Sequence, residues 1–281
     1  MKEITTSYLK EMKSNGEKIV MLTAYDYLTA KIIDSVGIEI ILVGDSLGMV
    51  FGGEKTTLSV TLDQMIYHTG VVSKAVKSAM VVGDMPFLSY QVNEEEAIRN
   101  AGRFLKEAGA KAVKLEGGEE MAKTIERIVN IGIPVMGHIG LTPQSIHQLG
   151  GFKVQGKSEE AAEKLLKSAK TLEQAGVFSL VLECVPSELS QMISESVSVP
   201  TIGIGAGLNC DGQVLVTHDL LGITESPFKF LKKYGKLKEE MERAYREFYS
   251  EVKEREFPDE QHSFFLKAEV FKQLKGKKRK G

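Results

Sequence analysis

Short runs of apolar residues recur along the chain, and each run ends in glycine or a polar residue. Eight of these runs are rich in Val, Ile and Leu and lack the strict alternation of a strand with one solvated face. Strands buried on both faces have this composition, and parallel sheets bury both faces. The eight predicted strands lie within residues 18–26, 38–46, 79–86, 110–118, 133–140, 178–186, 199–207 and 213–219.

Amphipathic stretches separate most of the predicted strands. Thr61, followed three residues later by Gln64, has the pattern of a capping box and predicts a helix through Lys77. Asn93 precedes three glutamates, which favour the positive end of a helix dipole. Residues 158–175 predict a third helix.

Glycine follows four of the helical stretches just before the next strand, where it enters the left-handed helix cap at little cost. These glycines are Gly37, Gly109, Gly132 and Gly176. The repeated unit of helix, glycine and buried strand predicts a (β/α)8 TIM-type barrel, and an open doubly wound sheet is the alternative. Both folds place active-site groups at the carboxyl ends of the strands.

The end of the chain has a different pattern. Residues 1–255 are predicted to form the barrel catalytic domain, and residues 256–281 a C-terminal helix and basic tail. Charged residues with apolar punctuation predict helices within 228–274, the last starting at Pro258. We expect its apolar residues to pack on the barrel or on a partner subunit, and the tail 275–281 to be solvated. Those apolar residues are Phe264, Phe265, Leu266 and Phe271.

Composition excludes several classes of protein. The chain has 281 residues, 42% hydrophobic and 26% charged, with a formal net charge of -2. This balance gives no positive field for nucleic acid or an anionic membrane. No apolar run approaches the roughly 20 residues that span a bilayer. The first residues are polar and lack the apolar core of a secretion signal, so we expect a cytoplasmic protein.

Carboxylates close four of the apolar strands: Asp45, Asp84, Glu116 and Glu183. A buried carboxylate is costly unless it is paired, hydrated or bound to a cation. Four of them at one barrel mouth favour a hard cation such as Mg²⁺, which prefers oxygen ligands. Zinc fits less well because His and Cys do not cluster, and the two cysteines are expected to be idle thiols.

Other polar residues near the strand ends each allow two interpretations. Ser46 either binds a substrate carboxylate or caps the following turn. Lys114 and Glu116 are two residues apart on one strand and share a face. Lys114 therefore either stabilises a developing enolate oxygen or simply pairs with Glu116. His138 is either close to the substrate or a hydrogen-bonded structural group, and His147 and His218 have weaker cases.

Glu183 ends a strongly apolar strand, where desolvation would make its carboxylate a better proton acceptor. The alternative is a buried pair with an unidentified partner. The glycine-rich run 203–207 lacks the rest of a phosphate-binding motif, so we favour tight backbone packing at the barrel rim. Together these residues indicate a barrel enzyme that uses a divalent cation and a carboxylate base beside a carbonyl group. They leave the substrate open.

Nine motifs give the chain a resemblance to the ketopantoate hydroxymethyltransferase family over residues 5–255. The motifs are TAYDY (23–27), VGDSLGMV (43–50), GDMPFLSY (83–90), VKLEGG (113–118), GHIGLTPQS (137–145), GGFKVQGK (150–157), VLECVP (181–186), VPTIGIGAG (199–207) and DGQVLVTHDLLGI (211–223). The family belongs to a wider group of barrels that act on phosphoenolpyruvate- and pyruvate-like compounds.

The resemblance implies transfer of a hydroxymethyl group from 5,10-methylenetetrahydrofolate to 3-methyl-2-oxobutanoate, which gives 2-dehydropantoate. It implies one Mg²⁺ per subunit, with Asp45, Asp84 and Glu116 in the cation site. It implies Glu183 as the proton acceptor. The residues implied to position the 2-oxo acid are Asp45, Ser46, Asp84, Lys114 and His138.

The resemblance also implies a homo-oligomer, a ring-based decamer. It does not account for the segment beyond about residue 255 or for the basic tail 275–281. A metal-dependent carbon–carbon lyase or phosphomutase of the same barrel group is the second enzymatic hypothesis. A non-enzymatic module that docks through the basic tail is a hypothesis of another class.

Overall fold

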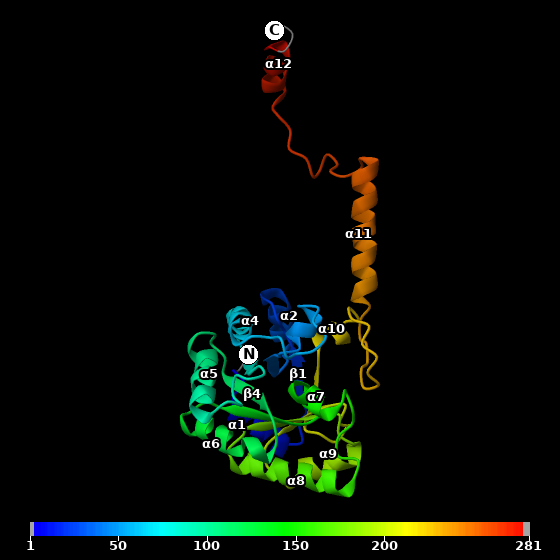
Figure 1. The fold of residues 1–281 in the computed structure, drawn as a ribbon. Coiled ribbons are helices and arrows are strands. Elements are labelled where there is room, and N and C mark those ends of the chain that lie inside the picture. The colour runs from blue at the N-terminus through cyan, green and yellow to red at the C-terminus, as the bar shows by residue number, and fades with distance from the viewer. Residues whose placement is uncertain (1–2, 278–281) are drawn as a thin grey trace.

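The computed structural model describes residues 3–277, and eight parallel strands in it form a closed barrel (Figure 1). The strands pair in chain order, and the last strand pairs with the first. They are β1 (Ile19–Thr23), β2 (Ile40–Val43), β3 (Met80–Asp84), β4 (Ala112–Glu116), β5 (Val135–Gly140), β6 (Ser179–Glu183), β7 (Thr201–Ile204) and β8 (Gly212–Leu215). Closure confirms the predicted barrel and excludes the open sheet.

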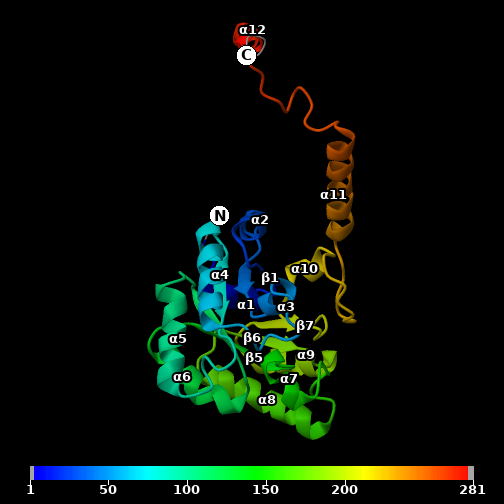
Figure 2. The same ribbon diagram turned by 45° about the horizontal axis from the view of Figure 1, so that its top comes forward.

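Helices surround the barrel (Figures 1 and 2). The α-helices are α1 (Thr6–Ser14), α2 (Tyr27–Val36), α3 (Leu47–Val50), α4 (Leu62–Ala75), α5 (Glu94–Lys106), α6 (Ala122–Asn130), α7 (Ile146–Leu149), α8 (Glu159–Gln174), α9 (Ser187–Ser196), α10 (Thr217–Leu220), α11 (Leu237–Glu254) and α12 (Ala268–Lys277). Two short 3-10 helices are η1 (Glu119–Met121) and η2 (Pro143–Ser145).

The helix starts predicted from sequence are confirmed. Thr61 and Gln64 form the reciprocal capping box of α4, and Asn93 accepts a hydrogen bond from the Glu96 amide at the start of α5. The Ser158 side chain caps α8 in the same way. The four predicted glycines all adopt positive φ, between 71° and 96°, so each makes the left-handed turn into the next strand.

Alternation along each strand divides the apolar residues between two cores. In β4, Val113 and Leu115 point outward and pack against the helices, whereas Ala112 joins the cluster inside the barrel. Lys114 and Glu116 share the inward face with Ala112, because side chains two apart point the same way. The alternation that fills the barrel with small and branched residues therefore ends in polar groups at the mouth.

The opposite end of the barrel is closed by α1. Leu9 and Met12 of this helix join the inner cluster beneath Ile19 and Ile40.

The glycine run at the rim of the mouth packs tightly, as predicted. A Cβ on Gly207 would lie 2.1 Å from Ser187 Oγ, and one on Gly205 would lie 2.8 Å from the Phe230 ring.

Two expectations for the end of the chain are wrong. The long helix begins at Leu237 rather than near residue 229, because the preceding segment is tied back to α10: the amides of Tyr234 and Leu237 donate to the Leu220 and Leu221 carbonyls. The last helix begins at Ala268 rather than at Pro258. Residues 258–267 have no core to pack on, and most short helices need one.

The helices α11 and α12 extend away from the barrel (Figures 1 and 2). Among the described residues 237–254, none is buried, and Phe264 is fully exposed. The expected packing of the terminal apolar residues on the barrel is therefore wrong, whereas packing on a partner subunit stays a prediction. Part of the predicted basic tail, residues 278–281, lies outside the described residues. Within residues 3–277, no helix is both long and apolar enough to cross a membrane.

Candidate active site at the barrel mouth

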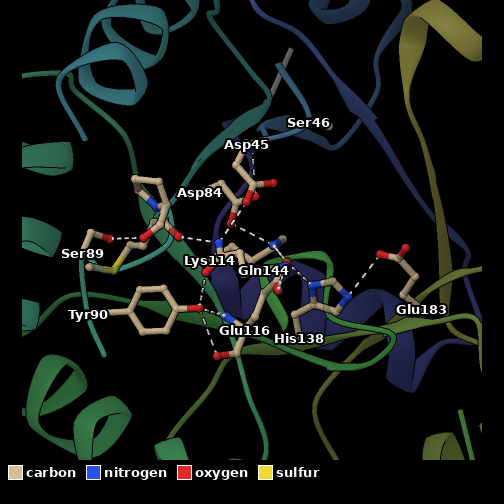
Figure 3. Close-up of polar contacts among 12 residues, drawn as sticks. Asp45, Ser46, Asp84, Ser89, Tyr90, Lys114, Glu116, His138, Gln144 and Glu183 are labelled. Carbon is tan, nitrogen blue, oxygen red and sulfur yellow. Dashed lines mark hydrogen bonds and ion pairs between the residues drawn. The ribbon is translucent and has the colours of Figure 1, made fainter. Parts of the chain in front are cut away.

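One cavity at the carboxyl ends of the strands is lined by all seven residues that the sequence singled out for the site. Its interior volume is about 140 Å³, and the space including the solvent at its open mouth is about 960 Å³. The seven residues are Asp45, Ser46, Asp84, Lys114, Glu116, His138 and Glu183. The close-up in Figure 3 shows the acidic side chains, Lys114 and His138 gathered around one centre. The fold therefore brings these seven residues together at the mouth, and the roles given to them from sequence stay predictions.

Lys114 is the central cation of the cluster. Its ammonium group lies 2.8 Å from Asp84 Oδ1 and 3.9 Å from Glu116 Oε1, and all three side chains are almost fully buried. Burial alone would lower the pKa of Lys114, but the nearby carboxylates outweigh burial and raise it. Lys114 is therefore charged, and Asp84 is its main partner, with the predicted Glu116 pairing the weaker one.

Negative charge exceeds positive charge in the cluster. Burial and then the charges of Asp84 and Glu116 raise the pKa of Asp45 well above its usual value. Burial and Glu116 also raise the pKa of Asp84, although Lys114 opposes the shift. A group that carries positive charge into this end of the cavity would relieve the repulsion.

His138 connects two of the carboxylates. Its Nδ1 lies 3.4 Å from Glu116 Oε1, and its Nε2 lies 3.3 Å from Glu183 Oε2. Both contacts are within ion-pair distance, but neither has the geometry of a hydrogen bond. Burial would lower the pKa of His138, yet the two carboxylates outweigh it and raise the pKa to about 9. His138 is therefore protonated at neutral pH.

Glu183 differs from the setting expected for it. Its side chain is 16% exposed, so it is the most accessible carboxylate of the group, and its partner is His138. The expectation of a deeply apolar setting is wrong because β6 ends at Glu183 and the side chain reaches the open part of the cavity. An accessible carboxylate held by a cationic imidazolium is well placed to meet a substrate.

Ser46 lies at the start of α3 without capping it. Its hydroxyl instead lies 2.8 Å from the Tyr25 hydroxyl, and Ser46 lines the cavity beside Asp45. The capping alternative is therefore excluded, and a substrate-binding role remains.

Gln144 is the main site residue that the sequence analysis missed. Its side-chain amide donates to Asp45 Oδ2 and to the Met85 carbonyl, both at 2.9 Å. Its carbonyl oxygen accepts from the Tyr90 hydroxyl at 2.7 Å, and its backbone amide donates to Glu116 Oε2 at 3.0 Å. A neutral side chain in a short 3-10 helix gives no charge signal, so only its neighbours in space identify it.

The thiols take no part in this network. Cys184 and Cys210 are both free, as expected. Burial and the neighbouring Glu183 raise the pKa of Cys184 to about 11, so its thiol stays protonated near neutral pH. Cys184 lines the cavity, but it is not a nucleophile there.

The residues fit a hard cation through their oxygen atoms and their uncompensated charge. Within residues 3–277 no three His, Cys, Asp or Glu side chains form a preassembled metal cluster. Asp45 and Asp84 are nevertheless linked, since the Asp45 amide donates to Asp84 Oδ2 at 3.1 Å, and both acids line the cavity. Both oxygens of Glu116 already face His138 and the Gln144 amide.

The fold and the cavity define the class of protein: a (β/α)8 barrel enzyme with an acidic, lysine-containing site at the carboxyl ends of its strands. The chain belongs to the ketopantoate hydroxymethyltransferase family, whose model matches residues 3–260. It is 57% identical over 265 residues to the 3-methyl-2-oxobutanoate hydroxymethyltransferase of Syntrophus aciditrophicus, covering 94% of this chain and 97% of that protein.

A second relative extends the similarity along the chain. The 3-methyl-2-oxobutanoate hydroxymethyltransferase of Syntrophomonas wolfei is 56% identical over 276 residues, covering 98% of this chain and all of that protein. The similarity therefore continues beyond residue 255, whereas the resemblance based on the motifs covered residues 5–255. The C-terminal segment is thus shared with a relative rather than peculiar to this chain.

Solved structures share the fold. Phosphonopyruvate hydrolase in complex with oxalate and Mg²⁺ has a TM-score of 0.60 at 12% identity, covering 98% of this chain and 96% of that one. The 2,3-dimethylmalate lyase, a member of the PEP mutase/isocitrate lyase superfamily, has a TM-score of 0.59 at 16% identity, covering 98% of each chain. At such identities the likeness shows the barrel alone.

Proposed function

We propose that this protein transfers a hydroxymethyl group from 5,10-methylenetetrahydrofolate to 3-methyl-2-oxobutanoate. The product is 2-dehydropantoate, a precursor of pantothenate and coenzyme A. The observation that carries the proposal is the arrangement of an accessible carboxylate, Glu183, in one cavity with a buried lysine and two linked aspartates. The names of the relatives at 56–57% identity agree with it.

The acidic end of the cavity is the proposed site of the 2-oxo acid and of Mg²⁺. Asp45 and Asp84 would hold the ion with Glu116 in the same site, because their oxygens and excess charge suit a hard cation. Bound there, Mg²⁺ would supply the positive charge that acidifies the hydrogen on carbon 3. Ser46 and Lys114 line the same end and offer a hydroxyl and an ammonium group to the oxygens of the oxo acid.

Glu183 is the proposed base, and His138 is the group that orients it. Glu183 takes the proton from carbon 3 of the oxo acid, which leaves an enolate. Lys114 stabilises the oxygen on which negative charge develops, as preorganised cations do in many enzymes. Water adds to the methylene carbon of the donor as one of its two bonds to folate nitrogens breaks, and a proton from the water goes to that nitrogen. The enolate carbon then bonds to the same carbon as its second bond to nitrogen breaks. The proton held by Glu183 goes to that second nitrogen, and tetrahydrofolate leaves.

A coupled assay tests the proposed function. The protein is incubated with the oxo acid, the methylene donor and Mg²⁺, and 2-dehydropantoate and tetrahydrofolate are both measured. We expect the two products in equal amounts, and we expect a chelator to stop their formation. Turnover of methylisocitrate or a phosphonate, with none of the folate donor, would instead favour the lyase or phosphomutase hypothesis.

We also propose that the chain forms a homo-oligomer, a decamer by family resemblance, in the cytoplasm. One face of α11 supports an assembly because it exposes Met241, Tyr245, Phe248 and Val252, although Phe248 meets the Phe257 ring edge to face. Large contiguous apolar surfaces of this kind mark interfaces. We keep residues 1–255 as the catalytic unit and 256–281 as an appended segment. Sedimentation of the full chain tests the assembly, since a monomer in dilute solution would contradict it.

A further inference from the structure

The cavity has a second wall that the proposed chemistry does not use. This wall is aromatic and uncharged, unlike the acidic end, and it is lined by Phe152, Phe228 and Phe230. The rings of Phe228 and Phe230 are stacked, with centroids 5.4 Å apart and planes inclined by 10°. Phe152 meets Phe228 edge to face at 5.3 Å. We call these three residues the aromatic wall.

The aromatic wall is held in place by the barrel rim. Phe230 packs over Gly205, where a Cβ would lie only 2.8 Å from the ring. The glycine run at residues 203–207 thus makes room for an aromatic ring, which gives this motif a purpose beyond close packing. The segment that carries Phe228 and Phe230 runs along the side of the barrel between α10 and α11 (Figure 1).

A buried carboxylate anchors the same segment. Asp219 is 7% exposed, and its Oδ1 accepts hydrogen bonds from the Thr224 hydroxyl and, at 2.8 Å, from the Ser226 hydroxyl. Asp219 and Ser226 both line the cavity beside Phe228. The aromatic wall therefore has a polar edge, with an acceptor for N–H groups and a hydroxyl.

This combination suits a flat nitrogen heterocycle. An aromatic surface stacks on a conjugated ring, and a carboxylate at its edge accepts hydrogen bonds from ring N–H and amino groups. The interior of the cavity is about 140 Å³, below the 300–1,000 Å³ of sites that enclose drug-sized ligands, and it opens to solvent at the mouth. A larger second substrate would therefore lie along the aromatic wall and extend out of the mouth.

We propose that the aromatic wall binds the heteroaromatic ring of the one-carbon donor, with Asp219 and Ser226 at its polar edge. This rests on the proposed function, since it assigns that function's second substrate to the other half of the same cavity. The acidic end then takes the oxo acid, and the two substrates meet between Glu183 and the aromatic wall. The two ends therefore have separate roles: the charged residues bind the oxo acid, and the aromatic wall binds the ring of the donor.

The test separates binding of the two substrates. Phe228→Leu and Phe230→Leu are compared with Phe264→Leu, which removes an exposed ring far along the chain from the cavity. Calorimetry measures the Kd of tetrahydrofolate and, in separate titrations with Mg²⁺, the Kd of 3-methyl-2-oxobutanoate. Because stacking on an aromatic ring contributes to the binding of a heteroaromatic base, we expect each cavity variant to raise the Kd of tetrahydrofolate roughly tenfold. The Kd of the oxo acid should change less than twofold, and the Phe264→Leu protein should match the wild type.

Two results would overturn the aromatic wall as the donor site. One is an unchanged Kd for tetrahydrofolate in both cavity variants. The other is an equal loss of affinity for both substrates, which would mean that the rings only shape the cavity. Circular dichroism confirms that each variant is folded before it is scored. Failure of the proposed function would look different, because the wild type itself would then form no 2-dehydropantoate from the two substrates.

Discussion

The two ends of the barrel treat buried carboxylates in opposite ways. At the closed end, Asp34 accepts hydrogen bonds from the backbone amides of Lys77, Ser78 and Ala79, at 2.8–3.0 Å, just before β3. Burial would raise the pKa of Asp34, but these amides outweigh it and lower the pKa. Asp211 at the same end accepts from Lys13 and from the Thr201 amide, both at 2.8 Å.

At the mouth, Asp84 and Glu116 each accept a hydrogen bond from one backbone amide, but the carboxylates also face one another. Asp45 has the Gln144 amide as its neutral donor, and burial together with Asp84 and Glu116 raises its pKa well above the usual value. The difference shows that a buried acid stabilises the fold only where the chain supplies donors for it. Where donors are too few, the unfavourable charge makes the site receptive to a cation and to catalysis.

The largest effect is expected from Glu183 at the mouth. Glu183→Gln keeps the shape of the side chain but cannot accept the proton from carbon 3. General base catalysis contributes about 10²- to 10⁴-fold, so turnover should fall by about that factor. Exchange of the carbon-3 hydrogen in deuterated water, followed by NMR, should stop as well. Exchange at the native rate would remove Glu183 from the role of base.

Gln144 should contribute to both stability and function. Gln144→Met preserves volume but removes the donor to Asp45 and to the Met85 carbonyl and the acceptor for the Tyr90 hydroxyl. Buried polar groups left without partners cost about 1–3 kcal/mol each, so the free energy of unfolding should drop by about 2–3 kcal/mol. Calorimetry should also show weaker Mg²⁺ binding. A variant as stable as the wild type would show that the hydrogen bonds of Gln144 do not stabilise the barrel mouth.

Asp34→Asn should destabilise the fold without changing the chemistry. Hydrogen bonds to a charged acceptor are worth about 1.5–3 kcal/mol, and we expect a loss of about 2 kcal/mol in urea unfolding at pH 7. Because the folded-state pKa of Asp34 is lowered, its contribution is fully present above the unfolded pKa of about 3.9 and is lost as pH falls through the folded pKa. The gap between wild type and variant should therefore shrink in acid. Lost turnover in folded Asp34→Asn protein would contradict a purely structural role.

Asp45→Asn provides the matched comparison at the mouth, with the smallest effect on stability. The raised pKa of Asp45 means that its charged form opposes folding, so stability falls as pH rises through that pKa. Replacing the carboxylate with an amide should leave the metal-free protein at least as stable as the wild type. Mg²⁺ affinity should fall at the same time. If Asp45→Asn lost as much stability as Asp34→Asn, the carboxylates at the two ends of the barrel would not differ in their contribution to folding.

The amino-acid sequence by itself determined the parts of this protein that depend on local chemistry. Apolar runs located all eight strands, glycines located the turns before four of them, and Thr61 and Asn93 located helix starts. The sequence also placed acidic residues at the ends of the predicted strands. Because side chains two residues apart on a strand point to the same face, it further predicted that Lys114 and Glu116 lie together. These features involve neighbours in sequence, so periodicity and capping rules find them.

Tertiary structure decided everything that depends on which distant residues meet. Barrel closure paired Lys114 with Asp84, exposed Glu183 to the cavity, and made Gln144 a clamp between Asp45 and Tyr90. It also brought Phe152 against Phe228, from loops far apart in the chain. The helix predicted to start at Pro258 does not form there, because exposed apolar residues such as Phe264 have no core within the described chain. Local patterns encode what a segment can form, whereas packing energy and charge balance depend on the neighbours that the fold supplies.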